Sequence, residues 1–202
     1  MSLRTDGLDL SGGLRCAGCL KRGMALCPPC ARRLEIPPSG HGGHMRVLAG
    51  WAYASSARAL VLELKAGGRR AAAEPLVARM CSTARRYGLA GELVTWVPGR
   101  RRDVRERGYD HAEALARGVA GGLGLPARAL LTHARPRPDQ VGLDAAARRA
   151  NLKGSFRAAP CSGAVVLVDD VFTTGATAAA CAAALETAGA ERVETLVACR
   201  AA

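Results

Sequence analysis

The chain has 202 residues, 49% of them hydrophobic, and carries a formal net charge of +12 at pH 7. This length and composition allow a sizeable buried core, which excludes a disordered protein and favours one main domain with a small appendage. The excess of basic over acidic residues predicts a surface that attracts phosphates or nucleic acids. The N-terminus has no apolar signal-peptide core, and no stretch approaches the roughly 18 apolar residues of a membrane span. We therefore expect a cytoplasmic protein with no membrane partner.

Four N-terminal cysteines form two Cys-x-x-Cys pairs, Cys16 with Cys19 and Cys27 with Cys30. In a reducing compartment, clustered cysteines indicate metal ligands rather than a disulfide framework. Two such pairs supply four thiolates at the spacing of a tetrahedral structural Zn²⁺ site, and reversible disulfides are the alternative. Residues 1–45 are therefore predicted to form a zinc-binding module with a linker. The scattered cysteines are expected to be small buried residues: Cys81, Cys161, Cys181 and Cys199.

From residue 46 onward, strand and helix patterns alternate. The predicted strands cover residues 46–53, 92–97, 127–134, 164–170 and 192–200. The predicted helices cover residues 55–68, 71–88, 110–119 and an alanine-rich stretch that ends at Gly189. Ser55 and Asp110 are expected to cap the first and third helices, which Gly67 and the pair Gly121 and Gly122 should end. This alternation predicts an α/β domain over residues 46–202, with a mostly parallel sheet flanked by helices.

The stretch VVLVDDVFTTGAT, residues 165–177, carries the strongest functional signal. Its apolar run is typical of an interior parallel strand, so Asp169 and Asp170 lie at the carboxyl end, where open α/β sheets bind ligands. The turn before the next helix offers free amides and a helix dipole, which predict an anion site. The residues of this turn are Thr173, Thr174, Gly175, Ala176 and Thr177.

A phosphorylated sugar fits both halves of this stretch. Its phosphate would occupy the turn while its hydroxyls donate to Asp169 and Asp170, and Mg²⁺ suits the same oxygen ligands. Because side chains alternate along a strand, both acids can face one ligand only if the backbone turns there. The alternative is that the acids cap the next helix and the turn is an ordinary loop.

These residues resemble the motif with which type I phosphoribosyltransferases bind phosphoribosyl pyrophosphate (PRPP). The blocks at residues 64–70, 97–116 and 140–156 are similar to those of the ComF family. The resemblance implies a type I phosphoribosyltransferase fold with an N-terminal zinc-binding segment, in a family linked to natural competence and DNA uptake. It assigns the ribose hydroxyls to Asp169 and Asp170, and the 5-phosphate to the turn that follows them.

The resemblance also implies a pyrophosphate loop at Pro98, Gly99 and Arg100. Residues 136–154 are rich in turn formers and basic residues, so they could close as a lid. The lid residues expected to contact PRPP are Arg148, Arg149 and Lys153. The expected activity is transfer of the phosphoribosyl group to an unidentified acceptor with release of pyrophosphate. A PRPP sensor without turnover, or an adaptor for single-stranded DNA or DNA-processing proteins, are the alternatives.

Several positions stay open at the level of sequence. Lys65 suits either a helix C-terminus or a ligand contact, and the arginines of residues 100–107 could form a solvated basic loop. His41 and His44 are too few ligands to define a second metal site. Asp110 and His111 stand where the ComF family more often has Asn and Gln, which leaves an acceptor contact from this pair undecided.

Overall fold

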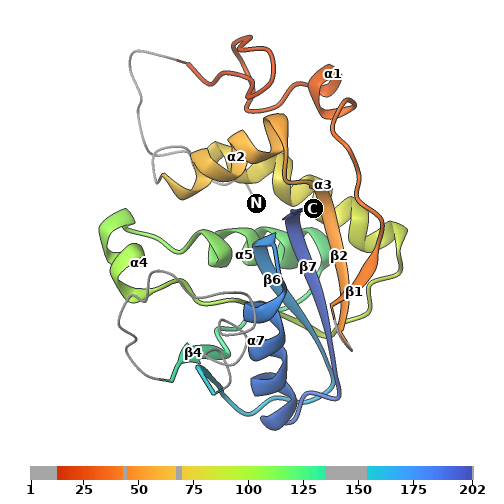
Figure 1. The fold of residues 1–202 in the computed structure, drawn as a ribbon, viewed down its shortest axis with the longest axis vertical. Helices are drawn as coiled ribbons and strands as arrows, with labels where there is room; N and C mark the ends of the chain where they lie inside the picture. Colours follow the sequence, from red (N-terminus) through yellow and green to blue (C-terminus); the bar gives the residue numbers. More distant parts are fainter. Residues whose placement is uncertain (1–12, 43–44, 67–69, 135–153, 202) are drawn as a thin grey trace.

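The computed structural model describes residues 13–42, 45–66, 70–134 and 154–201 (Figure 1). Five strands form the main sheet, in the spatial order β1-β2-β7-β6-β3. They are β1 (Gly40–Gly42), β2 (Met45–Ala52), β3 (Leu93–Trp96), β6 (Ala164–Phe172) and β7 (Arg192–Arg200). All neighbouring pairs are parallel except β1 with β2, which is an antiparallel pair at one edge. The prediction of a mostly parallel sheet is therefore confirmed.

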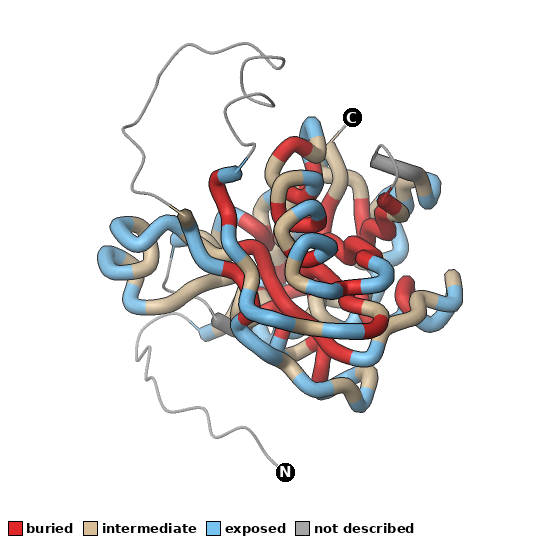
Figure 2. The backbone as a smooth tube through the Cα atoms, turned by 90° about the horizontal axis from the view of Figure 1, so that it is seen from below, coloured by how far each residue is buried: buried red, intermediate tan, exposed pale blue. Residues whose placement is uncertain are grey.

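Helices cover both faces of this sheet, as predicted. The helices are α1 (Pro28–Ala31), α2 (Ser55–Lys65), α3 (Ala73–Arg86), α4 (Arg101–Arg107), α5 (His111–Leu123) and α7 (Ala176–Thr187). One apolar core lies between the sheet and α2, α3 and α5, and a second lies on the side of α7. The buried segments gather in the interior between these layers (Figure 2). Because both faces of β6 are covered, its residues 165–168 are fully buried, which explains their continuous apolar run.

A small antiparallel sheet stands beside the main one. It consists of β4 (Leu131–His133) and β5 (Phe156–Ala158), and it packs against α7. The predicted strand at residues 127–134 is therefore shorter than expected and belongs to a different sheet. Ala127 contributes only an isolated parallel bridge to Val94 of β3.

Two predicted helix boundaries are wrong, for physical reasons. The cap position of α2 is Ala54 rather than Ser55, and no side chain caps this helix. Helix α5 continues through Gly121 and Gly122 and ends at Gly124, which has a left-handed φ of 74°. A Cβ on Gly122 would lie 2.6 Å from the Sγ of Cys81, so this glycine serves the close packing of α5 on α3 instead of ending the helix. The arginines after residue 100 form α4, not a loop.

The N-terminal segment shares a core with the sheet. Cys16, Ala25 and Leu26 are buried in the same apolar cluster as Leu48 of β2 and Leu60 of α2. Among the described residues, no helix has both the length and the apolar character needed to cross a membrane.

Replacing Leu196 by alanine tests the importance of this core. Leu196 lies in the central strand β7 and has no exposed surface. Its truncation should lower the free energy of unfolding by about 2 to 5 kcal/mol, because it leaves a cavity between packed layers. Leu62→Ala on α2, where the leucine is 41% exposed, is the control and should cost under about 1 kcal/mol. Denaturant unfolding measures both, and equal losses would contradict the described core.

Candidate ligand site at the carboxyl edge of the sheet

Strands β3 and β6 bring two predicted loops to the same edge of the sheet. The strands are parallel neighbours, with Trp96 paired to Val168. The amide of Val97 donates to the carbonyl of Val168 at 3.0 Å, which ties the start of the first loop to β6. Residues 98–100 follow β3, and residues 173–177 follow β6. The two loops therefore leave the sheet side by side.

The turn after β6 forms a surface hollow with an empty volume of about 250 Å³, part of which is open solvent. Asp169 and all five predicted turn residues line it: Thr173, Thr174, Gly175, Ala176 and Thr177. Gly175 has a φ of 74°, and a Cβ there would overlap the ring of Phe172. A glycine is therefore required for this turn. Because α7 begins at Ala176, its first amides lack helical partners and can bind an anion.

Asp170 is a buried carboxylate held by three chain segments. Its Oδ1 accepts from the amide of Val171 at 2.7 Å, and its Oδ2 lies 2.8 Å from Lys65 Nζ and 3.2 Å from His111 Nε2. Its side chain is 6% exposed. Burial alone would raise the pKa of Asp170, but the contacts with His111 and Lys65 prevail and hold it below its usual value. Lys65, left open by the sequence, thus pairs with an acid of the doublet.

The Oδ2 atom of Asp170 is buried between Lys65 and His111. Although Lys65 and His111 lie within ion-pair distance of Oδ2, no hydrogen bond to this atom is well aligned among the described residues. A buried acceptor without an aligned donor costs free energy of about 1 to 3 kcal/mol. A small movement of Lys65 or His111 that aligns a donor with Oδ2 would recover this free energy.

Asp169 has a different environment from its neighbour. It lies partly buried beside the hollow, and its Oδ1 accepts from the amide of Asp170 at 2.8 Å. Burial and the adjacent charge of Asp170 raise the pKa of Asp169 well above its usual value. The doublet thus combines one compensated carboxylate with one that is costly to ionise.

Asp110 connects the loop after β3 to α5. Its Oδ2 accepts from the amide of Gly99 at 2.7 Å, and its Oδ1 accepts from the amides of Ala112 and Glu113 at 2.9 and 3.4 Å. The predicted capping role is confirmed, and the bond to Gly99 is an addition that sequence reasoning missed. A Cβ on Gly99 would lie 2.9 Å from Asp110 Oδ2, so the glycine permits this close approach.

The predicted site residues are only partly brought together. Asp169 and the turn after β6 line one hollow, and Pro98, Gly99 and Arg100 begin the neighbouring loop. The side chain of Asp170 instead contacts α2 and α5 on the other face of the sheet. The predicted lid residues lie outside the described residues: Arg148, Arg149 and Lys153. The contact of His111 with Asp170 was not predicted. The available signal was a histidine directly after a predicted helix cap, in one of the blocks that resemble the ComF family.

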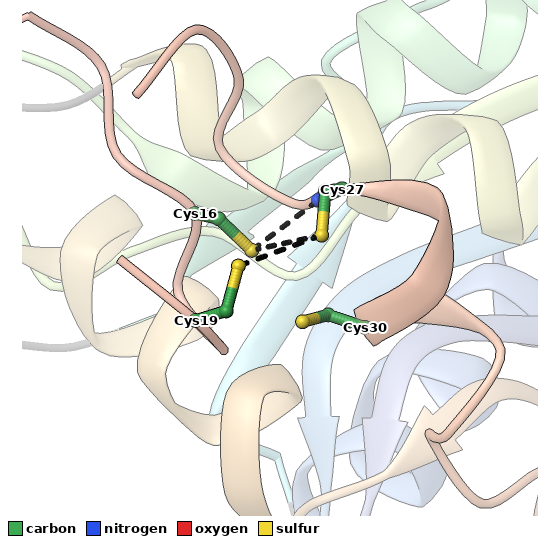
Figure 3. Close-up of side chains that lie close together, drawn as sticks. All are labelled: Cys16, Cys19, Cys27 and Cys30. Atoms are coloured by element: carbon green, nitrogen blue, oxygen red, sulfur yellow. Dashed lines mark hydrogen bonds between the residues drawn. The ribbon is translucent and has the colours of Figure 1, made fainter. Parts of the chain in front are cut away.

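The four N-terminal cysteines form a compact cluster (Figure 3). The sulfur atoms of Cys16, Cys19, Cys27 and Cys30 all lie within 4.8 Å of one another, and all thiols of the chain are free. A Cβ on Gly18 would lie 2.8 Å from Cys30 Sγ, so the small residue allows the first pair to close on the second. The cluster can hold a metal ion such as zinc.

The thiols of this cluster differ in acidity. Burial would raise the pKa of Cys16, but hydrogen bonds from backbone amides, including that of Cys27 at 3.3 Å, lower it to about 6. The interaction with the Cys27 thiol raises the pKa of Cys30 to about 12. Amides directed at a cysteine sulfur stabilise thiolate, the form that binds metal. Of the scattered cysteines, Cys161 is half-buried and the rest are buried: Cys81, Cys181 and Cys199.

The two acids of the doublet should affect stability in opposite directions. Because the pKa of Asp169 is raised in the folded protein, its ionised form opposes folding as the pH rises toward neutrality. Because the pKa of Asp170 is lowered, its ionised form stabilises folding above its unfolded pKa, and this contribution is lost as the pH falls. At neutral pH, Asp169→Asn should leave the free energy of unfolding unchanged or raise it. Asp170→Asn should lower it by about 2 kcal/mol or more. Denaturant unfolding of both variants checks this, and a larger loss for Asp169→Asn would contradict it.

Metal content tests the cysteine cluster. The purified protein should contain about one metal ion per chain, because four thiolates complete a tetrahedral site. Cys27→Ser should reduce this content and lower the melting temperature, whereas Cys161→Ser, outside the cluster, should retain the metal. Elemental analysis and thermal unfolding provide the two measurements. Undiminished metal in Cys27→Ser would rule out the cluster as its site.

Two solved structures show a distant likeness to the chain. One is an allosteric regulatory enzyme of purine biosynthesis, with 23% identity, a TM-score of 0.42, and coverage of 62% of this chain and 25% of that one. The other is glutamine PRPP amidotransferase from B. subtilis complexed with ADP and GMP, with the same identity and TM-score and 26% of its chain covered. The chain spans about a quarter of these proteins, and so low a TM-score adds nothing to the fold described above.

Sequence relatives are more informative. No protein-family model matches the chain. The DNA utilization protein YhgH of Salmonella typhi is 31% identical over 204 residues, covering 92% of this chain and 88% of the relative. The protein of the same name from Salmonella typhimurium strain LT2 matches with the same values. With this identity across nearly its whole length, the chain belongs to the family of the DNA utilization protein YhgH.

Proposed function

We propose that the chain is a ComF-like phosphoribosyltransferase of the cytoplasm. It binds PRPP with Mg²⁺ and transfers the phosphoribosyl group to an acceptor, releasing pyrophosphate. One observation carries this proposal: Asp169 and the turn at the start of α7 line the same hollow, at the carboxyl edge of a parallel sheet. An acid beside an anion site suits a ligand that carries hydroxyls and a phosphate close together.

The 5-phosphate is assigned to the turn after β6. The first amides of α7 and the hydroxyls of Thr173, Thr174 and Thr177 offer donors around the hollow. Each charge-assisted hydrogen bond contributes about 1.5 to 3 kcal/mol, so several hold a phosphate ester firmly. Gly175 keeps the turn tight enough for its amides to face one group.

The ribose hydroxyls are assigned to Asp169 and Asp170. Asp169 borders the hollow that the turn forms, and Asp170 is the next residue of β6. The carboxylate oxygens also suit a hard cation, and bound Mg²⁺ would offset the charge of the pyrophosphate. The chain's own part is to orient the sugar so that C1 faces the acceptor.

The leaving pyrophosphate is assigned to the basic residues around the first loop. Pro98, Gly99 and Arg100 begin this loop, and Asp110 fixes it to α5 through the Gly99 amide. The sequence adds Arg148, Arg149 and Lys153 from the proposed lid. Their guanidinium and ammonium groups would stabilise negative charge as the bond to C1 breaks, while the lid excludes water. In this proposal residues 1–45 form a zinc-binding module and residues 46–202 the transferase domain.

A non-catalytic role in DNA handling is the second candidate. The relatives are named DNA utilization proteins, and the chain carries a net charge of +12. Helix α4 adds exposed arginines, among them Arg101 and Arg105. A non-catalytic adaptor of the DNA-uptake machinery, which binds PRPP without turnover or associates with single-stranded DNA or DNA-processing proteins, would use these features. Such binding should weaken steeply with added salt, because phosphate contacts release counterions.

Calorimetry with PRPP and Mg²⁺ tests the proposed site. The wild-type chain should bind saturably, and Gly175→Ala should weaken binding about tenfold or more, because the new methyl overlaps Phe172 and deforms the turn. Gly121→Ala is a matched control, since a Cβ at Gly121 meets no atom within 4 Å, and it should bind like wild type. Pyrophosphate release across a panel of acceptors then separates the two candidates. Binding without release favours the adaptor, and absence of binding refutes both PRPP roles.

A further inference from the structure

A chain of polar contacts connects α4, α5 and β6. It runs from Arg107 in α4 through His111 in α5 to Asp170 in β6. Arg107 Nη1 lies 3.4 Å from His111 Nδ1, and His111 Nε2 lies 3.2 Å from Asp170 Oδ2. The chain therefore links the helix after the proposed pyrophosphate loop to an acid of the proposed ribose site.

Both ends of this chain are anchored. The Nε of Arg107 donates to the carbonyl of Asp103 at 2.9 Å, and its Nη2 lies 3.5 Å from the carboxylate of Asp103. Asp170 is fixed on its other side by Lys65 and by the amide of Val171. The His111 side chain is 13% exposed. The ring is therefore confined between a cation and an anion.

The contact with Arg107 selects between the two tautomers of the neutral ring. Arginine has only donors, so the histidine nitrogen that faces Arg107 must act as an acceptor. The single proton of the neutral imidazole then lies on Nε2, the atom that faces Asp170. A small rotation of the ring or of the carboxylate would align this N–H with Oδ2.

We propose that His111 is a positioning residue that orients the carboxylate of Asp170 for the sugar hydroxyls. The inference rests on the proposed PRPP site and deepens it. His111 donates through Nε2 to Asp170, and Arg107 enforces the Nε2–H tautomer of the neutral ring. Because Arg107 belongs to α4, the orientation of Asp170 depends on the position of this helix, which follows the proposed pyrophosphate loop. The contacts among Arg107, His111 and Asp170 then align the proposed pyrophosphate site with the proposed ribose site.

Two substitutions distinguish the loss of the His111 hydrogen-bond donor from the loss of its side-chain volume. His111→Gln keeps an N–H donor of similar reach without an ionisable ring, and His111→Leu fills comparable volume without a donor. Affinity for PRPP with Mg²⁺ should fall about tenfold or more in His111→Leu and stay within about threefold of wild type in His111→Gln. Glu106→Gln, which alters an exposed ion pair on α4, is the control and should bind like wild type. Thermal unfolding establishes that each variant is folded.

A measurement without PRPP tests the same inference. The ¹⁵N chemical shifts of the imidazole, recorded at mildly alkaline pH on the free protein, distinguish the two neutral tautomers. The Nε2–H form is expected in wild type. An Nδ1–H form would overturn the inference, and so would wild-type affinity in His111→Leu. If wild type itself binds no PRPP, the proposed function falls together with the positioning role. If wild type binds and both His111 variants match it, only the positioning role falls.

Discussion

Two adjacent carboxylates at the end of a buried strand determine how this edge of the protein is built. Removing a charge from water costs several kcal/mol unless opposite charge or donors replace the lost hydration. Asp170 meets this demand with Lys65 from α2, His111 from α5 and the amide of Val171. Asp169 meets it only in part, and its pKa rises accordingly. The last residue of one helix and the first residue of another therefore converge on β6.

At the end of β6, acidic side chains and an anion-binding turn lie within a few residues of each other. Asp170 carries negative charge, and the turn that follows the acids presents the positive end of α7. A simple anion would gain at the turn and lose near the acids, whereas a ligand with hydroxyls and a phosphate gains at both. Gly175 determines the distance between the acids and the turn, because any side chain on Gly175 would displace Phe172. The selectivity expected of the proposed site would thus follow from backbone geometry as much as from side-chain identity.

The sequence predicted the local features well because each had a local cause. The buried run of residues 165–168 required a strand covered on both faces, and Asp110 with Glu113 marked a helix start. The errors occur where tertiary packing changes the role of a residue. Gly122 suggested a helix end but serves contact with Cys81. The partners of Asp170 could not be predicted, because Lys65 and His111 are distant in sequence and meet it only through the sheet topology.

The cysteine cluster and the acid doublet share one structural element. Cys16 is buried in the apolar core that also contains Leu60 and Leu64 of α2, and the cluster lies near the opposite end of this helix, where Gly18 approaches Ser56. Lys65, the last residue of α2, pairs with Asp170. A small cysteine-rich segment has little core of its own, so a bound metal would set its shape. Helix α2 therefore contacts the cysteine segment at its start and places Lys65 against Asp170 at its end.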